Sequence, residues 1–124
     1  MKLFFMIGSI SGFLSVALGA FGAHALKEKL DEYSIGIFHT GVTYQTTHAL
    51  ALVLVALLLK WYPESSGLVW AGWCFVAGTL IFSGSLYTLA MTGIKVLGAI
   101  TPIGGLLFLI GWALLAIHAW KSVS

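Results

Sequence analysis

Hydrophobic residues form four long runs, and charged residues are confined to the two ends of the chain and to the short segments between the runs. The runs without Asp, Glu, Lys or Arg cover residues 3–26, 33–59, 65–94 and 96–120. Each run is longer than the ~20 residues that an α-helix needs to cross about 30 Å of hydrocarbon. The pattern predicts an all-α protein, a four-span transmembrane helical bundle. We expect the spans at about 3–26, 44–61, 68–91 and 97–120.

The second span is preceded by a segment of mixed polarity. Ser34 is a candidate N-cap, and Ile35, Phe38 and Val42 follow it at helical spacing with polar residues between them. Such a stretch is typical of an amphipathic helix at the membrane interface. We therefore predict a short amphipathic lead-in to the second helix, continuous through Tyr44 if that helix is tilted.

Two starts are open for the fourth span. The helix could begin near Val96 and be kinked by Pro102, or Thr101 could be its N-cap with Pro102 as the first helical residue. Proline favours the first helical position because its missing N–H has no intrahelical acceptor there. The second start is favoured, which leaves residues 97–100 irregular.

Small residues recur along one face of the first span. Their spacing of 4, 3, 4 and 3 residues is a period of 3.5, which places them on one helical stripe. The members are Gly8, Gly12, Ser15, Gly19 and Gly22. In lipid, a stripe of small residues lets a neighbouring helix approach closely. We therefore expect this stripe to be the helix-packing face, with the first span at the centre of the bundle.

Composition agrees with a membrane protein and excludes several other classes. Of the 124 residues, 60% are hydrophobic and 8% are charged, so the chain fits a single transmembrane domain over residues 1–124 and leaves no room for a soluble one. The net charge is only +2 and there is no Arg, so no nucleic-acid partner is predicted. The lone Cys74 excludes an internal disulfide.

The first span could instead be read as a signal peptide. Lys2 gives a minimal basic start, and Ala23 and Ala25 flank His24 as in a cleavage site. The apolar run is long for a signal peptide, however, and we expect the span to be retained.

An even number of spans places both termini on one side of the membrane. Each side then holds three lysines, so the positive-inside rule does not decide the orientation. The lysines are Lys2, Lys60 and Lys121 on the side of the termini, and Lys27, Lys29 and Lys95 on the other. The free amino terminus on one side, and three acids on the other, favour cytoplasmic termini.

Histidine and tyrosine residues gather near the membrane face opposite the termini. His24 closes the first span there and His48 opens the second, so we expect them to lie close together with Tyr44 or Tyr87 in reach. Hydroxyl groups near the same face complete a candidate ligand or proton site. They are Ser83, Ser85 and Thr101. The alternative is structural: the two imidazoles bond to each other, to a tyrosine or to a backbone carbonyl where helices meet.

No metal site, cofactor or catalytic group is predicted. Imidazole suits Zn, Cu or Fe, but no single helix carries paired His ligands and no carboxylate lies within a span. The serines have no neighbouring base and orienting acid, which a nucleophile needs.

Four ordered motifs bear a family resemblance that covers nearly the whole chain. They are GAFGAHALK (19–27), TGVTYQTTHALAL (40–52), GTLIFSGSLY (78–87) and LGAITPIGGLLFLIGW (97–112). Together they resemble the family catalogued as domain of unknown function 423, the YwdK/YgdD-like small bacterial membrane proteins related to transmembrane protein 256. The resemblance implies a four-span, multi-pass protein of the bacterial cytoplasmic membrane. It implies no activity.

Two classes of function follow. The first is a non-enzymatic packed or oligomeric bundle that contacts the lipid bilayer, a second copy or other membrane proteins. The alternative is a small conduit or binding site for a metal, a proton or a small ligand, built around His24 and His48. The sequence favours the first class and gives little support for an enzyme.

Overall fold

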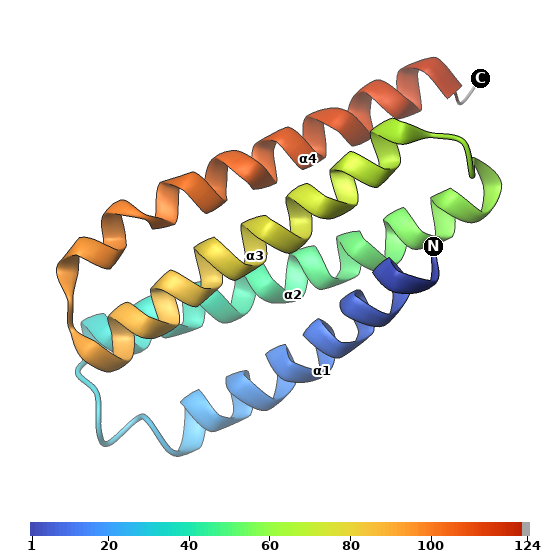
Figure 1. The fold of residues 1–124 in the computed structure, drawn as a ribbon. Helices are drawn as coiled ribbons and strands as arrows, with labels where there is room; N and C mark the ends of the chain where they lie inside the picture. The colour runs from blue at the N-terminus through green and yellow to red at the C-terminus, as the bar shows by residue number, and fades with distance from the viewer. Residues whose placement is uncertain (123–124) are drawn as a thin grey trace.

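The computed structural model describes residues 1–122, which form four long helices joined by short connections (Figure 1). The elements are α1 (Lys2–His24), α2 (Glu32–Trp61), α3 (Ser66–Thr92), the 3-10 helix η1 (Lys95–Ala99) and α4 (Thr101–Ser122). No strand occurs among these 122 residues, and all four long helices are apolar enough to cross a membrane. The prediction of an all-α, four-span bundle is confirmed.

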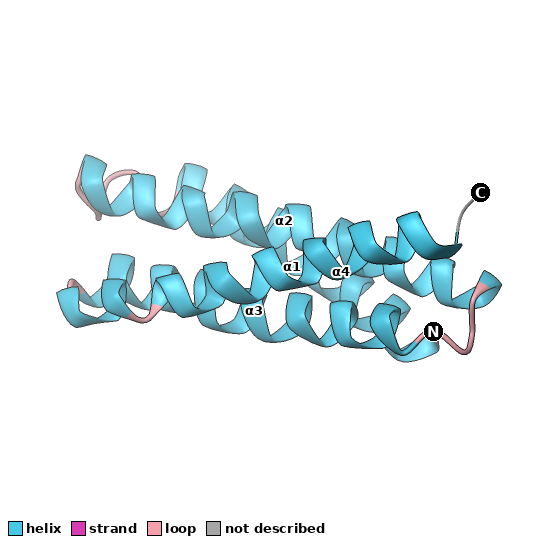
Figure 2. Cartoon of the chain, turned by 90° about the horizontal axis from the view of Figure 1, so that it is seen from above, coloured by secondary structure: helices cyan, strands magenta, loops and turns pink. Residues whose placement is uncertain are grey.

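The helices alternate in direction, so the connections gather at two ends of the bundle (Figure 2). Met1, the α2–α3 turn at residues 62–65 and the end of α4 share one end, here called the terminal end (Figure 1). There the Tyr62 hydroxyl donates to the backbone oxygen of Ser122 at 3.5 Å. The connections at residues 25–31 and 93–100 form the opposite end.

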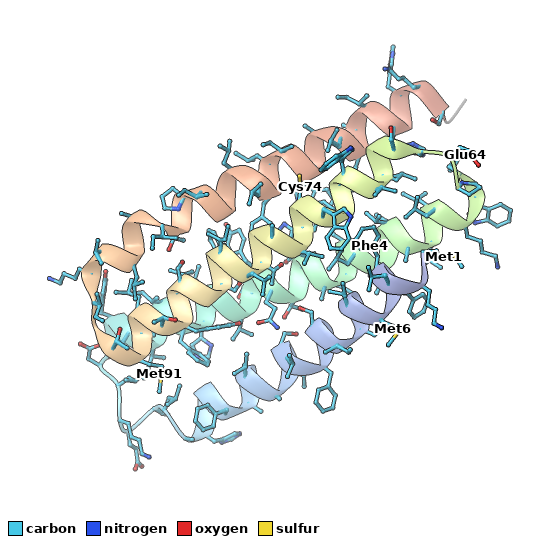
Figure 3. The ribbon with its side chains drawn as sticks, in the orientation of Figure 1. Met1, Phe4, Met6, Glu64, Cys74 and Met91 are labelled. Atoms are coloured by element: carbon cyan, nitrogen blue, oxygen red, sulfur yellow. The ribbon has the colours of Figure 1, made fainter. Side chains whose placement is uncertain are left out.

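Each helix packs mainly on its neighbour in the chain. The extensive contacts join α1 to α2, α2 to α3, and α3 to α4, which matches their order across Figure 1. Phe4 extends the contact of α1 to α3 (Figure 3), where its ring meets Trp73 edge-on at 5.2 Å. α1 therefore lies at an edge of the bundle, and the expectation that it would be central is wrong.

Glycines that lie directly against aromatic residues set the spacing between helices. On the α3–α4 contact, a Cβ atom added at Gly104 would lie 2.5 Å from the backbone nitrogen of Phe82, and one at Gly111 would lie 2.5 Å from the Phe75 ring. An aromatic ring lies against a glycine at three further sites, one of which is also between α3 and α4. These are Phe108 on Gly78, Tyr87 on Gly41 and Phe4 on Gly72. Close approach of this kind is how membrane helices gain van der Waals packing without a hydrophobic driving force.

The small-residue stripe of α1 lies against α2, but it is tight at only two positions. A Cβ added at Gly8 would lie 3.0 Å from the Ala49 carbonyl oxygen, and one at Gly22 would lie 2.7 Å from the Phe38 ring. At Gly12 and Gly19 the nearest atoms are 3.9 Å and 3.5 Å away, which is ordinary contact. Ser15, the fifth member, is buried and donates to the Gly12 carbonyl at 2.8 Å.

The second helix begins earlier than expected. Asp31 is its N-cap, and the Asp31 carboxylate accepts a hydrogen bond from the backbone N–H of Ser34 at 2.8 Å. This bond holds the pKa of Asp31 below its ordinary value. Ser34 is therefore not the cap, and the amphipathic lead-in forms the first turns of one continuous helix of 30 residues.

The fourth helix begins close to the second of the two expected starts. η1 occupies residues 95–99 before it, and Pro102 lies in its first turn. Thr101 belongs to the helix, and its hydroxyl donates back to the Leu97 carbonyl at 3.3 Å. Thr101 is therefore the first residue of α4 and not the N-cap that the sequence predicted.

Candidate functional site

His48 lies midway along α2, and both of its ring nitrogens are occupied. Nδ1 is 2.7 Å from the carbonyl oxygen of Tyr44, and the indole N–H of Trp112 donates to Nε2 at 3.0 Å. A carbonyl can only accept and an indole N–H can only donate. The imidazole is therefore neutral, with its proton on Nδ1.

Aromatic rings enclose this imidazole. Phe108 stacks on it with ring centroids 3.6 Å apart and planes 9° apart, and Tyr44 lies 6.2 Å away at 8°. Tyr44 is thus in reach of His48, as expected, although the nearest polar contact is its carbonyl and not its hydroxyl. Neither nitrogen of His48 is free to hold a metal ion or accept a proton without losing one of these bonds.

His24 is not part of this cluster. It is exposed at the end of α1 and makes no side-chain hydrogen bond within the described chain. Gly22, two residues before His24, faces Phe38 of α2. Phe38 lies ten residues before His48, so the two are about 15 Å apart along the axis of α2. The expectation that His24 and His48 would lie together is wrong, because His48 sits deeper and contacts α4.

A second polar cluster, centred on Gln45, escaped the sequence analysis. Its amide nitrogen donates to the carbonyl oxygen of Ser11 at 3.0 Å and to the Ser11 hydroxyl at 3.3 Å. Its amide oxygen accepts from the Tyr87 hydroxyl at 2.6 Å. Gln45 therefore ties α1, α2 and α3 together. The available signal was a single amide within an apolar span, where a polar group must find a partner inside the protein.

The predicted hydroxyl groups are also engaged inside the bundle. Ser83 donates to the Gly41 carbonyl at 2.7 Å, which joins α3 to α2. Ser85 and Thr101 share a hydrogen bond of 2.6 Å, which joins α3 to α4. Ser83 and Tyr87 line the same hollow, whereas Ser85 and Thr101 are not part of its lining. The structure thus does not bring the predicted set into one site.

The remaining histidines lie apart from both clusters. His39 is exposed near the start of α2, and His118 is buried near the end of α4, at the terminal end. Residues 1–122 contain no group of three or more His, Cys, Asp and Glu side chains that could hold a metal ion. The polar groups of the two clusters therefore hold helices together.

Comparison with known proteins shows which family has this sequence. A family profile described as "Protein of unknown function (DUF423)" matches residues 18–105. A UPF0382 membrane protein of Staphylococcus aureus is 46% identical over 121 residues, 98% of each chain. The UPF0382 membrane protein YwdK of Bacillus subtilis is also 46% identical over 98% of each chain.

A UPF0382 membrane protein of Staphylococcus haemolyticus is 46% identical over 123 residues, 99% of each chain. No solved structure matches the chain. These relatives are bacterial membrane proteins, and the match covers nearly their full length. The resemblance drawn from the four motifs is confirmed. The chain belongs to the DUF423 family, whose members are membrane proteins of unknown function.

Proposed function

We propose that the protein works without catalysis, as a packed helical bundle of the bacterial cytoplasmic membrane that contacts lipid and other membrane chains. The observation that supports this is that polar side chains within the membrane-spanning helices form hydrogen bonds to neighbouring helices. His48, Gln45 and Ser83 each bond to another helix of the same bundle. Gln45 and Ser83 also line a hollow of about 400 Å³, and His48 lines one of about 540 Å³. The hydrogen bonds of the three side chains nevertheless go to neighbouring helices, which is the usual role of polar groups where membrane helices meet.

The alternative, a conduit or ligand site around His24 and His48, has less support. The two residues are far apart along the bundle, and both nitrogens of His48 already have partners. The only acidic residues lie in or beside the connections, namely Glu28, Asp31, Glu32 and Glu64. A proton or cation pathway would normally contain such a group within the membrane.

The outer helices supply the surface for contacts with other chains. α1 and α4 each pack mainly on one neighbour, and the opposite faces are apolar and exposed. On α1, Phe13 is 74% exposed, and on α4 Leu109 is 67% exposed. These faces contact lipid, a second copy of the chain, or another integral membrane protein.

Reconstitution into liposomes tests the non-conduit part of this proposal. Proteoliposomes should leak protons and metal cations no faster than protein-free liposomes, with an entrapped pH-sensitive or metal-sensitive dye as the readout. A protein-dependent flux that the His48→Gln variant abolishes would contradict the proposal.

Cysteine cross-linking in native membranes tests the association part. In a Cys74→Ser background, Phe13→Cys or Leu109→Cys should give a reproducible cross-linked product that contains a second copy or another membrane chain. Val55→Cys is the control, because Val55 is fully buried and should give none. If neither outer face yields a product, the bundle does not associate through α1 or α4.

We further propose that the terminal end faces the cytoplasm. Lys2, Lys60 and Lys121 lie at this end with the amino terminus and one acid, Glu64, whereas three acids offset the lysines at the opposite end. Reporter fusions after residue 30 and at the C-terminus should report opposite sides, the latter cytoplasmic. A C-terminal signal from the outer side of the membrane would reverse the orientation.

A further inference from the structure

A hollow of about 540 Å³ lies between α2 and α4, which both pack on α3 (Figure 1). This volume falls within the range of about 300–1,000 Å³ that small-molecule sites occupy. None of the described residues that line it is charged, so the hollow suits a neutral molecule rather than an ion. Most of the lining consists of aromatic rings, which belong to Tyr44, His48, Phe82, Phe108 and Trp112.

The hollow lies near the middle of the membrane. Phe108 is at the centre of the charge-free run 96–120, and Tyr44 is two residues from the centre of the run 33–59, about 3 Å along the axis of α2. Lipid headgroups are about 15 Å away, at the edge of a hydrocarbon core about 30 Å thick. Tyrosine and tryptophan usually occupy that edge, whereas Tyr44 and Trp112 lie deep in the hydrocarbon.

Tyr44 brings a hydroxyl without a partner to this depth. Its side chain is 42% exposed, and within residues 1–122 its one hydrogen bond beyond the helix is made by its carbonyl oxygen, to His48. Hydroxyls such as that of Thr47 bond back to a carbonyl one turn earlier, but a tyrosine hydroxyl, at the far end of its ring, cannot reach its own helix. A hydroxyl left unbonded in hydrocarbon is costly, which indicates that an acceptor from outside the chain binds here.

The surroundings of this hydroxyl define the acceptor. The acyl chain of a phospholipid has no oxygen at the membrane centre, because its ester groups stay near the headgroups. A flat ring would stack on aromatic side chains, and the ring of Tyr44 already lies 4.5 Å from that of Phe82. At Gly105 no side chain covers Phe82, since the nearest ring atoms are 3.8 Å from an added Cβ. A neutral, flat ring that carries a carbonyl oxygen fits these conditions.

We propose that the hollow between α2 and α4 binds the ring of a lipid-soluble quinone. The Tyr44 hydroxyl donates to a quinone carbonyl, and the electron-poor quinone ring stacks on the electron-rich aromatic side chains. The apolar tail of the quinone remains in the bilayer. Both nitrogens of His48 keep their present bonds, and His24 takes no part. The inference goes beyond the function proposed above, because it requires neither a conduit nor a second chain.

Native mass spectrometry of the full chain tests the site. The protein is reconstituted in nanodiscs that contain equal amounts of menaquinone-4 and squalene, released, and scored for retained ligand. Squalene is the control, because it is an isoprenoid hydrocarbon without a ring or an oxygen atom. The wild type should retain menaquinone-4 about tenfold over squalene. Equal retention of the two would overturn the proposal, since the hollow would then select only for apolar character.

Two substitutions locate the binding. Tyr44→Phe keeps the ring and removes the hydroxyl, so it should lower retention of menaquinone-4 about fivefold. Tyr33→Phe, at the start of α2, is its control and should change nothing. Gly105→Leu fills the hollow and should abolish retention, whereas Gly84→Leu, outside this lining, should not. If Gly105→Leu fails to fold, Tyr44→Phe decides. A folded Tyr44→Phe variant with wild-type retention would overturn the proposal.

A second copy of the chain is the competing occupant of the hollow. In a Cys74→Ser background, Tyr44→Cys should give no disulfide-linked dimer in native membranes, because the quinone proposal leaves this face to a small molecule. A Tyr44→Cys dimer, together with no retention of menaquinone-4 by the wild type, would assign the hollow to a second copy and make the quinone assignment wrong.

Discussion

The indole N–H of Trp112 donates to Nε2 of His48 across 3.0 Å, and this bond joins α4 to α2. The two helices are not neighbours in the packing order, since α3 contacts both of them. The bond therefore joins α2 to α4 directly, beside the stacking of Phe108 on the His48 ring. It also sets the tautomer of His48, whose Nδ1 proton goes to the Tyr44 carbonyl.

Replacing Trp112 by Phe should destabilise the bundle by about 0.5–2 kcal/mol, because it leaves Nε2 of His48 without a donor. Denaturant titration in detergent, followed by circular dichroism, measures the change. Trp120→Phe is the control, since Trp120 is 89% exposed and should have no effect. Equal stability of the two variants would show that the bond contributes nothing.

Removing the amide of Gln45 or the hydroxyl of Tyr87 should each destabilise the protein. Gln45→Leu leaves the Tyr87 hydroxyl unpaired, and Tyr87→Phe leaves the Gln45 amide oxygen unpaired. A buried polar group that loses its partner costs about 1–3 kcal/mol. The double variant should therefore cost less than the sum of the single variants. Simple additivity in this cycle would mean that the two groups are not coupled.

Adding one methyl group to adjacent glycines of α4 should have opposite consequences. Gly104→Ala should destabilise the protein by about 1–3 kcal/mol, because the Cβ meets the Phe82 backbone at 2.5 Å and backbone atoms cannot rotate away. Gly105→Ala should be neutral or stabilising, since its nearest neighbours are 3.8 Å away and Ala favours helix. Thermal unfolding midpoints of the two variants decide between these outcomes.

On α1, substitutions at the tight and at the loose positions of the stripe should affect stability differently. Gly8→Ala and Gly22→Ala should lower stability, whereas Gly12→Ala and Gly19→Ala should be tolerated, because only the first pair has contacts of 3.0 Å or less. The readout is the concentration of denaturing detergent at which each variant unfolds. If all four variants behaved alike, the contact would depend on the whole stripe.

The contribution of the Asp31 cap should depend on pH. The hydrogen bond from Ser34 lowers the pKa of Asp31 in the folded state. The contribution is therefore present at pH above about 4, the ordinary range of Asp, and is lost as the pH falls below that range. The stability difference between wild type and Asp31→Ala should shrink at low pH. Glu28→Ala, which removes a charge without removing a cap, should show no such trend.

The four helices were predictable because the bilayer sets a minimum length for a span. Charged residues occur only at the two ends of the chain and in or beside the connections. The number of apolar runs therefore gives the number of crossings directly. The helix ends were harder to place. Ser34 and Asp31 are both good caps, and nothing local distinguishes a lead-in at the interface from the first turns of a continuous helix.

The relation between His24 and His48 could not be obtained from the sequence. A helical pattern gives the angular position of a residue on its own helix, but it does not say which neighbour lies on that side. His48 faces α4, whose Trp112 lies 64 positions further along the chain. The stripe of α1 shows the same limit, because its period is regular while the space at Gly12 depends on which α2 residue lies opposite.

The role of Gln45 was missed for a different reason. The predicted site consisted of histidines, tyrosines and hydroxyl groups, yet the amide is the side chain that bonds to two other helices. Within hydrocarbon any polar group must find a partner, so a single amide is as informative there as a histidine.

The packing of each helix on its chain neighbour has a consequence for biosynthesis. Contacts between consecutive helices are local in sequence, which favours rapid folding. Gly22 and Phe38 meet as soon as the first hairpin has been inserted, and Tyr87 reaches Gly41 once the third helix follows. Each new segment can thus dock on the previous one while the ribosome is still translating the rest. The bond between His48 and Trp112 is then among the last to form.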